Sequence, residues 1–123
     1  MKSKAISQMT VSELVEKFVE IAVAQDHAEL RGQIGKYNLL FKQMINVEGE
    51  LKSRDGDQRR ELLRLFDHPN LHVRVQAAML TLAVAPVEAR AQLEMLAASD
   101  RLPYSADAGM CLWNLDRGVF KPT

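Results

Sequence analysis

The residues from 71 to 85 are apolar on two sides of a helix, and this pattern constrains the fold more than any other feature of the sequence. At 100° per residue, the two apolar faces are separated by narrow polar strips that carry Arg74 and Gln76. A helix of this kind needs a neighbour on both sides, as in the middle layer of a helical stack. One face holds Val73, Ala77, Leu80 and Val84, and the other holds Leu71, Val75, Ala78, Leu82 and Ala85.

The other periodic segments also predict helices, and no segment shows the period-two alternation of a half-buried strand. Capping residues mark several ends: Thr10 or Ser12 begins the first helix, the chain turns near Gly32, Pro86 opens the fifth helix and Gly118 ends the last. The expected helices cover about residues 12–30, 33–52, 57–66, 71–85 and 104–116, and a further helix begins at Pro86 and includes Leu93, Leu96 and Ala97. We therefore expect an all-α fold, a short right-handed stack (α-α superhelix) of about six helices.

Helix 33–52 carries its apolar residues as one stripe, which we expect to form core. The charged and amide side chains Lys36, Gln43 and Asn46 lie opposite that stripe. The stripe comprises Ile34, Tyr37, Leu40, Phe41, Met44, Ile45, Val47 and Leu51.

Composition sets the outer limits of the fold and of its environment. With 123 residues, 47% hydrophobic and 26% charged, the chain suits one globular domain, which we place at residues 11–123 after a flexible segment 1–10. The single Cys111 has no disulfide partner, and the polar N-terminus lacks the apolar stretch of a signal peptide, which favours a cytoplasmic protein. No stretch approaches the length of a membrane span.

The run from Leu62 to Ala78 resembles a HEAT or armadillo-like repeat. Its turn, Asp67-His68-Pro69-Asn70, is followed by Val73-Arg74 and the small pair Ala77-Ala78. Comparing the chain with itself at an offset of 31 residues also pairs Leu62 with Leu93 and Ala77 with Ala108. The resemblance implies a HEAT-like helical-repeat fold, in which Asp67 and Arg74 organise the turn and play structural roles.

The span from about Val11 to Pro122 is similar to a family of small bacterial proteins known only as a domain of unknown function with a HEAT-like fold. The similarity includes Leu14-Val15-Glu16-Lys17-Phe18, Leu82-Ala83-Val84-Ala85-Pro86 and the run from Asp107 to Trp113. It supports the helical fold and implies no substrate.

The sequence offers no motif for catalysis, and we expect neither an enzyme nor a bound cofactor or metal. His68 and His72 have the spacing of zinc ligands on a helix, but His68 precedes Pro69 in the turn and no HExxH pattern is present. Cys111 lies on an apolar helix face without a base nearby in sequence, which favours a core residue over a nucleophile.

Glu48 is the most unusual carboxylate, because it falls inside the apolar arc of helix 33–52. We interpret it as a structural residue, paired with a lysine or arginine or exposed at the edge of the core; a functional acid is the alternative.

Four basic side chains near the end of that helix, Lys52, Arg54, Arg59 and Arg60, could face phosphates and bind nucleic acid. Charge balance opposes this hypothesis, since 16 basic and 16 acidic residues cancel over the chain and the excess between residues 33 and 66 is small. Nucleic-acid binding is therefore the alternative function.

Met110 and Trp113 in the last helix point away from Cys111 and need a cover. We expect the tail to fold back so that Val119 and Phe120 pack on Trp113; an exposed docking surface that includes Met110, Trp113 and Phe120 is the other interpretation. The leading functional hypothesis is a non-catalytic protein-interaction module with an adaptor or immunity-like role. Its partner is another protein or a second copy of the chain, with no membrane partner.

Overall fold

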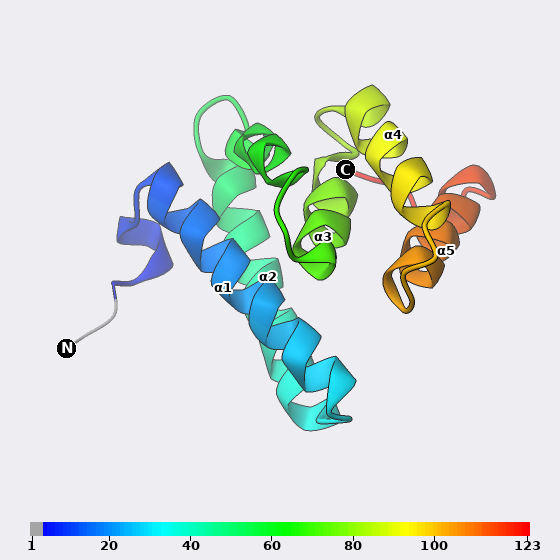
Figure 1. Ribbon diagram of the computed structural model, residues 1–123. Helices are drawn as coiled ribbons and strands as arrows, with labels where there is room; N and C mark the ends of the chain where they lie inside the picture. The colour runs from blue at the N-terminus through cyan, green and yellow to red at the C-terminus, as the bar shows by residue number, and fades with distance from the viewer. Residues whose placement is uncertain (1–3) are drawn as a thin grey trace. The chain divides into compact units, whose positions relative to one another are not determined.

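The structure is a computed structural model that describes residues 4–123, and every regular element in that range is helical (Figure 1). Six elements match the six expected helices, so the all-α class is confirmed; the third is a 3-10 helix rather than an α-helix. The HEAT-like right-handed stack stays a prediction. The elements are η1 (Ile6–Gln8), α1 (Val11–Leu30), α2 (Ile34–Ser53), η2 (Gln58–Leu65), α3 (Leu71–Thr81), α4 (Pro86–Ala97) and α5 (Tyr104–Asp116).

The chain folds as two compact units, unit 1 up to Glu61 and unit 2 from Leu62. The expectation of a single domain over residues 11–123 stays a prediction, as does the flexibility of residues 1–10, of which residues 1–3 lie outside the described part. No helix in residues 4–123 is long and apolar enough to cross a bilayer.

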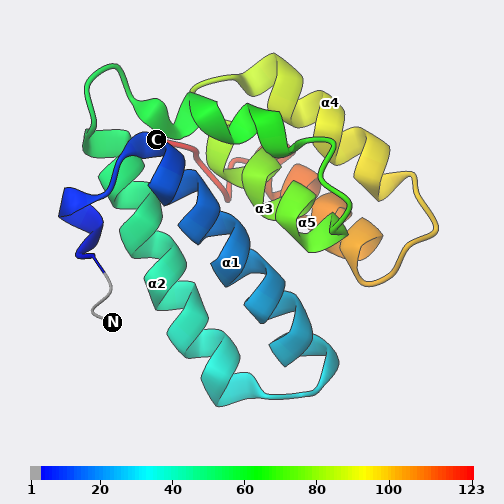
Figure 2. The same ribbon diagram turned by 60° about the vertical axis from the view of Figure 1, so that its left-hand side comes forward.

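Unit 1 is an antiparallel pair of helices, α1 and α2, which lie side by side (Figure 2). Thr10 starts α1 with a capping box: its hydroxyl accepts from the Glu13 N–H at 3.1 Å, and its own N–H donates to the Glu13 carboxylate at 2.9 Å. Gly32 makes the turn at φ +67°, a conformation that favours glycine. Completely or almost completely buried in this unit are Leu14, Phe18, Ile21, Ala22, Ala28, Met44, Val47 and Leu51.

Arg54 holds the segment before α1 against the end of α2. Its guanidinium donates to the carbonyls of Ile6 at 3.2 Å and Met9 at 2.7 Å, and its Nε donates to Glu50 at 2.7 Å. Lys4 adds an exposed ion pair with Glu13 at 3.0 Å. Residues 4–10 are therefore bonded to both helices of unit 1.

Unit 2 is built around α3, which packs against α4 and α5, while α4 packs against α5. Both faces of α3 are buried as predicted, with Val73 and Ala77 on one face and Val75 and Ala78 on the other. The second face belongs to a continuous apolar cluster. Its buried members are Val75, Ala78, Leu82, Ala89, Leu93, Leu96, Ala108 and Cys111, and Phe120 packs against them.

The expectation that this helix runs to residue 85 is wrong, because α3 ends at Thr81. The Thr81 hydroxyl donates to the carbonyls of Ala77 and Ala78, and the Thr81 carbonyl accepts from the N–H groups of Val84 and Ala85 in a tight turn. Ala85, at φ −146° and ψ 64°, is outside the helical conformation, which the residue before a proline disfavours. Pro86 then occupies the first turn of α4, as predicted.

Candidate interaction surfaces

The exposed face of α5 carries two large apolar side chains and a cation, which together form the α5 patch: Met110, Trp113 and Arg117. Met110 is 52% exposed and Trp113 57% exposed. The Arg117 guanidinium lies over the indole ring, 4.8 Å from its centroid. Spacings of three and four residues place these side chains on one face of the helix.

The tail does not cover Trp113, contrary to the expectation that it packs there. Gly118 ends the helix at φ +72°, and the next two N–H groups both donate to the Asn114 carbonyl, at 2.9 and 3.0 Å. This turn directs Phe120 onto the core of unit 2 and leaves Val119 65% exposed. Phe120 is thus partly buried, whereas Met110 and Trp113 are exposed; a docking role for the three residues stays a prediction.

Helix α2 exposes part of the stripe that we expected to be core. Ile34, Phe41 and Ile45 are 73%, 50% and 48% exposed, whereas Met44, Val47 and Leu51 are buried. The stripe spans about 160° at 100° per residue, which is wider than the face that one neighbouring helix covers. With the exposed Asn38 between them, the three exposed apolar residues form the α2 strip: Ile34, Asn38, Phe41 and Ile45.

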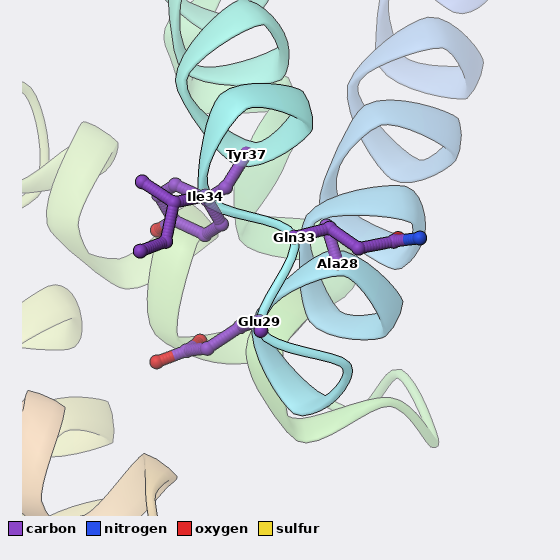
Figure 3. Close-up of a pocket in the computed structure, with 6 residues that line it drawn as sticks. Ala28, Glu29, Gln33, Ile34 and Tyr37 are labelled. Carbon is purple, nitrogen blue, oxygen red and sulfur yellow. The ribbon is translucent and has the colours of Figure 1, made fainter.

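A shallow pocket of about 290 Å³ lies at the turn between α1 and α2. In Figure 3 the side chains of Ile34 and Glu29 extend to one side of this turn, while that of Gln33 extends to the other. Its lining is Ala28, Glu29, Gly32, Gln33, Ile34 and Tyr37. The volume is at the lower limit for a small-molecule site, and no set of polar groups converges as an active site requires. The pocket is better described as the end of the α2 strip.

The four basic residues of the predicted nucleic-acid edge do not form one exposed surface. Lys52 and Arg60 are exposed, but Arg59 is only 4% exposed, and Arg54 is half-buried and bonded to Glu50 and to two backbone carbonyls. The expectation is therefore wrong for Arg54 and Arg59, whose guanidinium groups are engaged within unit 1. Two exposed cations are too few to track a phosphate backbone.

Arg59 is the partner of the unusual carboxylate Glu48. Its Nη1 lies 3.8 Å from Glu48, and its Nε and Nη2 donate to both oxygens of Asp57 at 2.9 and 2.7 Å. These hydrogen bonds lower the pKa of Asp57 and raise that of Arg59. Glu48 thus has the arginine pairing that we gave as its structural interpretation.

A family model described as a domain of unknown function (DUF2019) matches residues 12–116. The chain belongs to this family. No curated protein matches the chain. The chain is similar to a protein of solved structure, RPA1889 from Rhodopseudomonas palustris CGA009, with 53% sequence identity. The match includes 98% of this DUF2019 chain and 100% of the RPA1889 chain, and the TM-score is 0.93. The expected relationship to an uncharacterised bacterial family is confirmed.

The turn before α3 of the DUF2019 chain is organised by residues other than those that the HEAT resemblance implies. Asn70 accepts from the Val73 N–H at 3.1 Å, and His68 Nδ1 accepts from the Asn70 N–H at 3.0 Å. Asp67 is exposed, and its expected structural role stays a prediction. Arg74 is half-buried, and its Nε has no hydrogen-bond partner among those residues.

Cys111 of the DUF2019 chain lies in the core of unit 2 and is 6% exposed. Burial raises the pKa of its thiol, which disfavours the thiolate that a nucleophile requires.

Proposed function

We propose that this DUF2019 protein is a non-catalytic interaction module that binds a partner protein through the α5 patch. The observation that carries the proposal is the exposure of Trp113, 57%, beside the half-exposed Met110 on a helix whose other face packs in the core. Tryptophan and methionine are enriched at protein interfaces, and tryptophan in particular is over-represented among the residues that dominate binding energy.

The chemistry of the α5 patch describes the docking segment of the partner. Trp113 and Met110 favour an apolar side chain that covers both. Arg117 stacks on Trp113 and keeps edge N–H groups for a carboxylate, whereas the neighbouring Asp116 is occupied by Arg90 at 2.7 Å. A segment that combines an apolar anchor with an acidic residue fits this surface.

An adaptor or immunity-like role in the cytoplasm belongs to the same proposal. It is supported by the single, buried Cys111, which has no disulfide partner, and by analogy with small helical-repeat proteins, which the expected HEAT-like fold resembles. The nucleic-acid alternative loses its support because Arg54 and Arg59 are engaged within unit 1.

The experiment compares three tagged full-length baits in a lysate of the source organism: the wild type, Met110→Ser with Trp113→Ser, and the control Val87→Ser, which removes a side chain 75% exposed on α4. We expect a protein that the wild type and the control both retain and the double variant loses. For the identified partner, Trp113→Ser should weaken binding by roughly 2 kcal/mol, about 30-fold. Equal retention by all three baits would contradict the proposal.

A further inference from the structure

We propose that the α2 strip pairs with the α2 strip of a second copy, antiparallel and about a twofold axis, to form a weak homodimer. The surface is separate from the α5 patch, so the inference goes beyond the function proposed above. It rests on the spacing of the strip, on two exposed glycines beside it and on the charges at its end.

The spacing of the strip is that of a helix-pairing seam. Ile34, Asn38, Phe41 and Ile45 are separated by four, three and four residues, the alternation that keeps side chains on the contact line of two paired helices. Within unit 1, α2 contacts α1 through the other side of its stripe, which is buried. The α2 strip therefore has the pattern of a helix-pairing interface, and no helix of unit 1 packs on it.

Two glycines inside α2 have no explanation within the described chain. A Cβ atom at Gly35 or Gly49 would meet no atom within 4 Å, and neither residue has a positive φ. Glycine destabilises a helix interior by roughly 1 kcal/mol relative to alanine. Gly35 and Lys42 each follow a strip position by one residue, and at 100° per residue Gly49 lies on the same flank, so a second backbone can approach the strip closely there.

Antiparallel pairing makes the strip complementary to itself. With the twofold axis between residues 39 and 40, Ile34 faces Ile45 of the second copy, and Asn38 faces Phe41. On the flank, the stem of Lys42 lies over Gly35 of the other copy, where no side chain obstructs it. An isologous contact of this kind closes with two copies.

The charges at the end of the strip select the antiparallel arrangement. The same four-three spacing continues to Glu48 and Lys52. Glu48 is paired with Arg59, but a parallel pair would place Lys52 against Lys52 of the second copy, like charge against like, which is unfavourable. The antiparallel pair separates them and opposes the two helix dipoles favourably. The net charge of zero adds no long-range repulsion between copies.

The surface area that the two strips would bury predicts a weak dimer. Exposed fractions of 73%, 50% and 48% for the three apolar residues correspond to roughly 300 Å² per copy, given about 200 Å² for a large side chain. With the flanking residues, the pair buries roughly 1,000 Å² in total, the lower end for specific interfaces. We expect a dissociation constant on the order of 100 µM.

Sedimentation equilibrium of the full chain from about 5 to 500 µM tests the dimer, starting from the 13.9 kDa monomer. Phe41→Ser with Ile45→Ser should weaken association roughly tenfold or more. Leu39→Ser is the matched control, since Leu39 is 58% exposed on the same helix but about 140° from Ile34, and it should change nothing. A monomer at every concentration, or equal weakening by Leu39→Ser, would overturn the proposal.

Gly49→Ala separates an interface role from a structural one. Alanine should raise the urea midpoint of unfolding, because it favours the helix, while it weakens association if a second backbone approaches there. A rise in both stability and association would contradict the glycine argument.

Cross-linking tests the direction of the pair. With a short bis-maleimide reagent, Ile34→Cys combined with Ile45→Cys should give a covalent dimer, and neither single variant should; the native Cys111 is buried. Efficient cross-linking of the single variants would show a parallel pair and refute the proposed register. The α5 variant Met110→Ser with Trp113→Ser should leave the dimer unchanged, so this inference and the proposed function fail separately.

Discussion

Arg59 illustrates how a charged residue acquires a structural task in this fold. Its side chain is 4% exposed, and both oxygens of Asp57 and one of Glu48 face its guanidinium. A buried cation needs such partners, because an unpaired charge away from water is strongly unfavourable. The three residues thus connect α2 to the beginning of η2 in unit 1.

Asp57→Asn should destabilise the protein by roughly 1 to 2 kcal/mol at pH 7, because the amide leaves Arg59 with the longer contact to Glu48. The Asp57 side chain is 29% exposed, which keeps the effect at this modest level. Asparagine tolerates the backbone conformation at φ +54° that Asp57 adopts, so the substitution tests charge rather than strain. Urea unfolding followed by circular dichroism measures the change.

The stability difference between wild type and Asp57→Asn should also depend on pH. The pKa of Asp57 is lowered in the folded state, so its contribution is complete above the unfolded pKa of about 3.9 and is lost as the pH falls through the folded pKa. The difference in unfolding free energy between wild type and Asp57→Asn should therefore shrink at acidic pH. Asp55→Asn, at an exposed neighbouring position, is the control and should leave the unfolding free energy unchanged at every pH. If the difference between wild type and Asp57→Asn stays constant down to about pH 2, the ion pair is not its cause.

The pairing of Arg59 could not be predicted from the sequence, because a count of charges does not say which side chain turns inward. Lys52, Arg54, Arg59 and Arg60 cannot be told apart by charge or by position in the sequence. In the structure, however, Lys52 and Arg60 are exposed, whereas Arg54 and Arg59 are bonded within unit 1. The alternative pairings of Glu48 were all compatible with its helical position. The pairing depends on the turn at residues 54–57, which brings Asp57 and Arg59 close to Glu48.

At the level of elements, periodicity and capping predicted most helices within a few residues, since local chemistry determines their ends. Thr10, Gly32, Pro86 and Gly118 all mark boundaries as expected. The errors arose where tertiary structure decides. A wide apolar stripe does not say how much of it a neighbour covers. The apolar periodicity beyond Thr81 also did not show that the chain leaves α3 there in a turn, in which the Thr81 carbonyl accepts from the N–H groups of Val84 and Ala85.

Thr10→Ala should destabilise the protein by about 1 kcal/mol, because it removes the hydroxyl that accepts from the Glu13 N–H at the start of α1. Ser12→Ala is the control, since Ser12 is exposed within the first turn and does not act as the cap. Thermal and urea unfolding of both variants measure the difference. Equal losses would assign the effect to general helix propensity rather than to the cap.

For the whole molecule, the balance of 16 basic and 16 acidic residues bears on solubility. Proteins without net charge tend to associate non-specifically. Replacing the exposed Arg101 and Lys121 with glutamate changes the charge by two at each site, from zero to −4. The amount of polyethylene glycol needed to precipitate the protein at pH 7 should rise. The dissociation constant of the specific α2 dimer, measured in salt that screens the added charges, should stay the same. If the dissociation constant of the dimer rises together with the precipitation threshold, the dimer itself is non-specific.

Phe120 lies beyond the end of α5 and contributes a side chain to the core of unit 2. Any handle, label or surface anchor placed within a few residues of Phe120 therefore lies close to the apolar core of unit 2. Trimming the chain after Val119 should uncover the cluster around Leu93 and increase binding of a hydrophobic dye. For immobilisation or labelling, the exposed turn at Gly32 is an alternative that does not disturb Phe120, since a Cβ atom added at Gly32 would meet no atom within 4 Å.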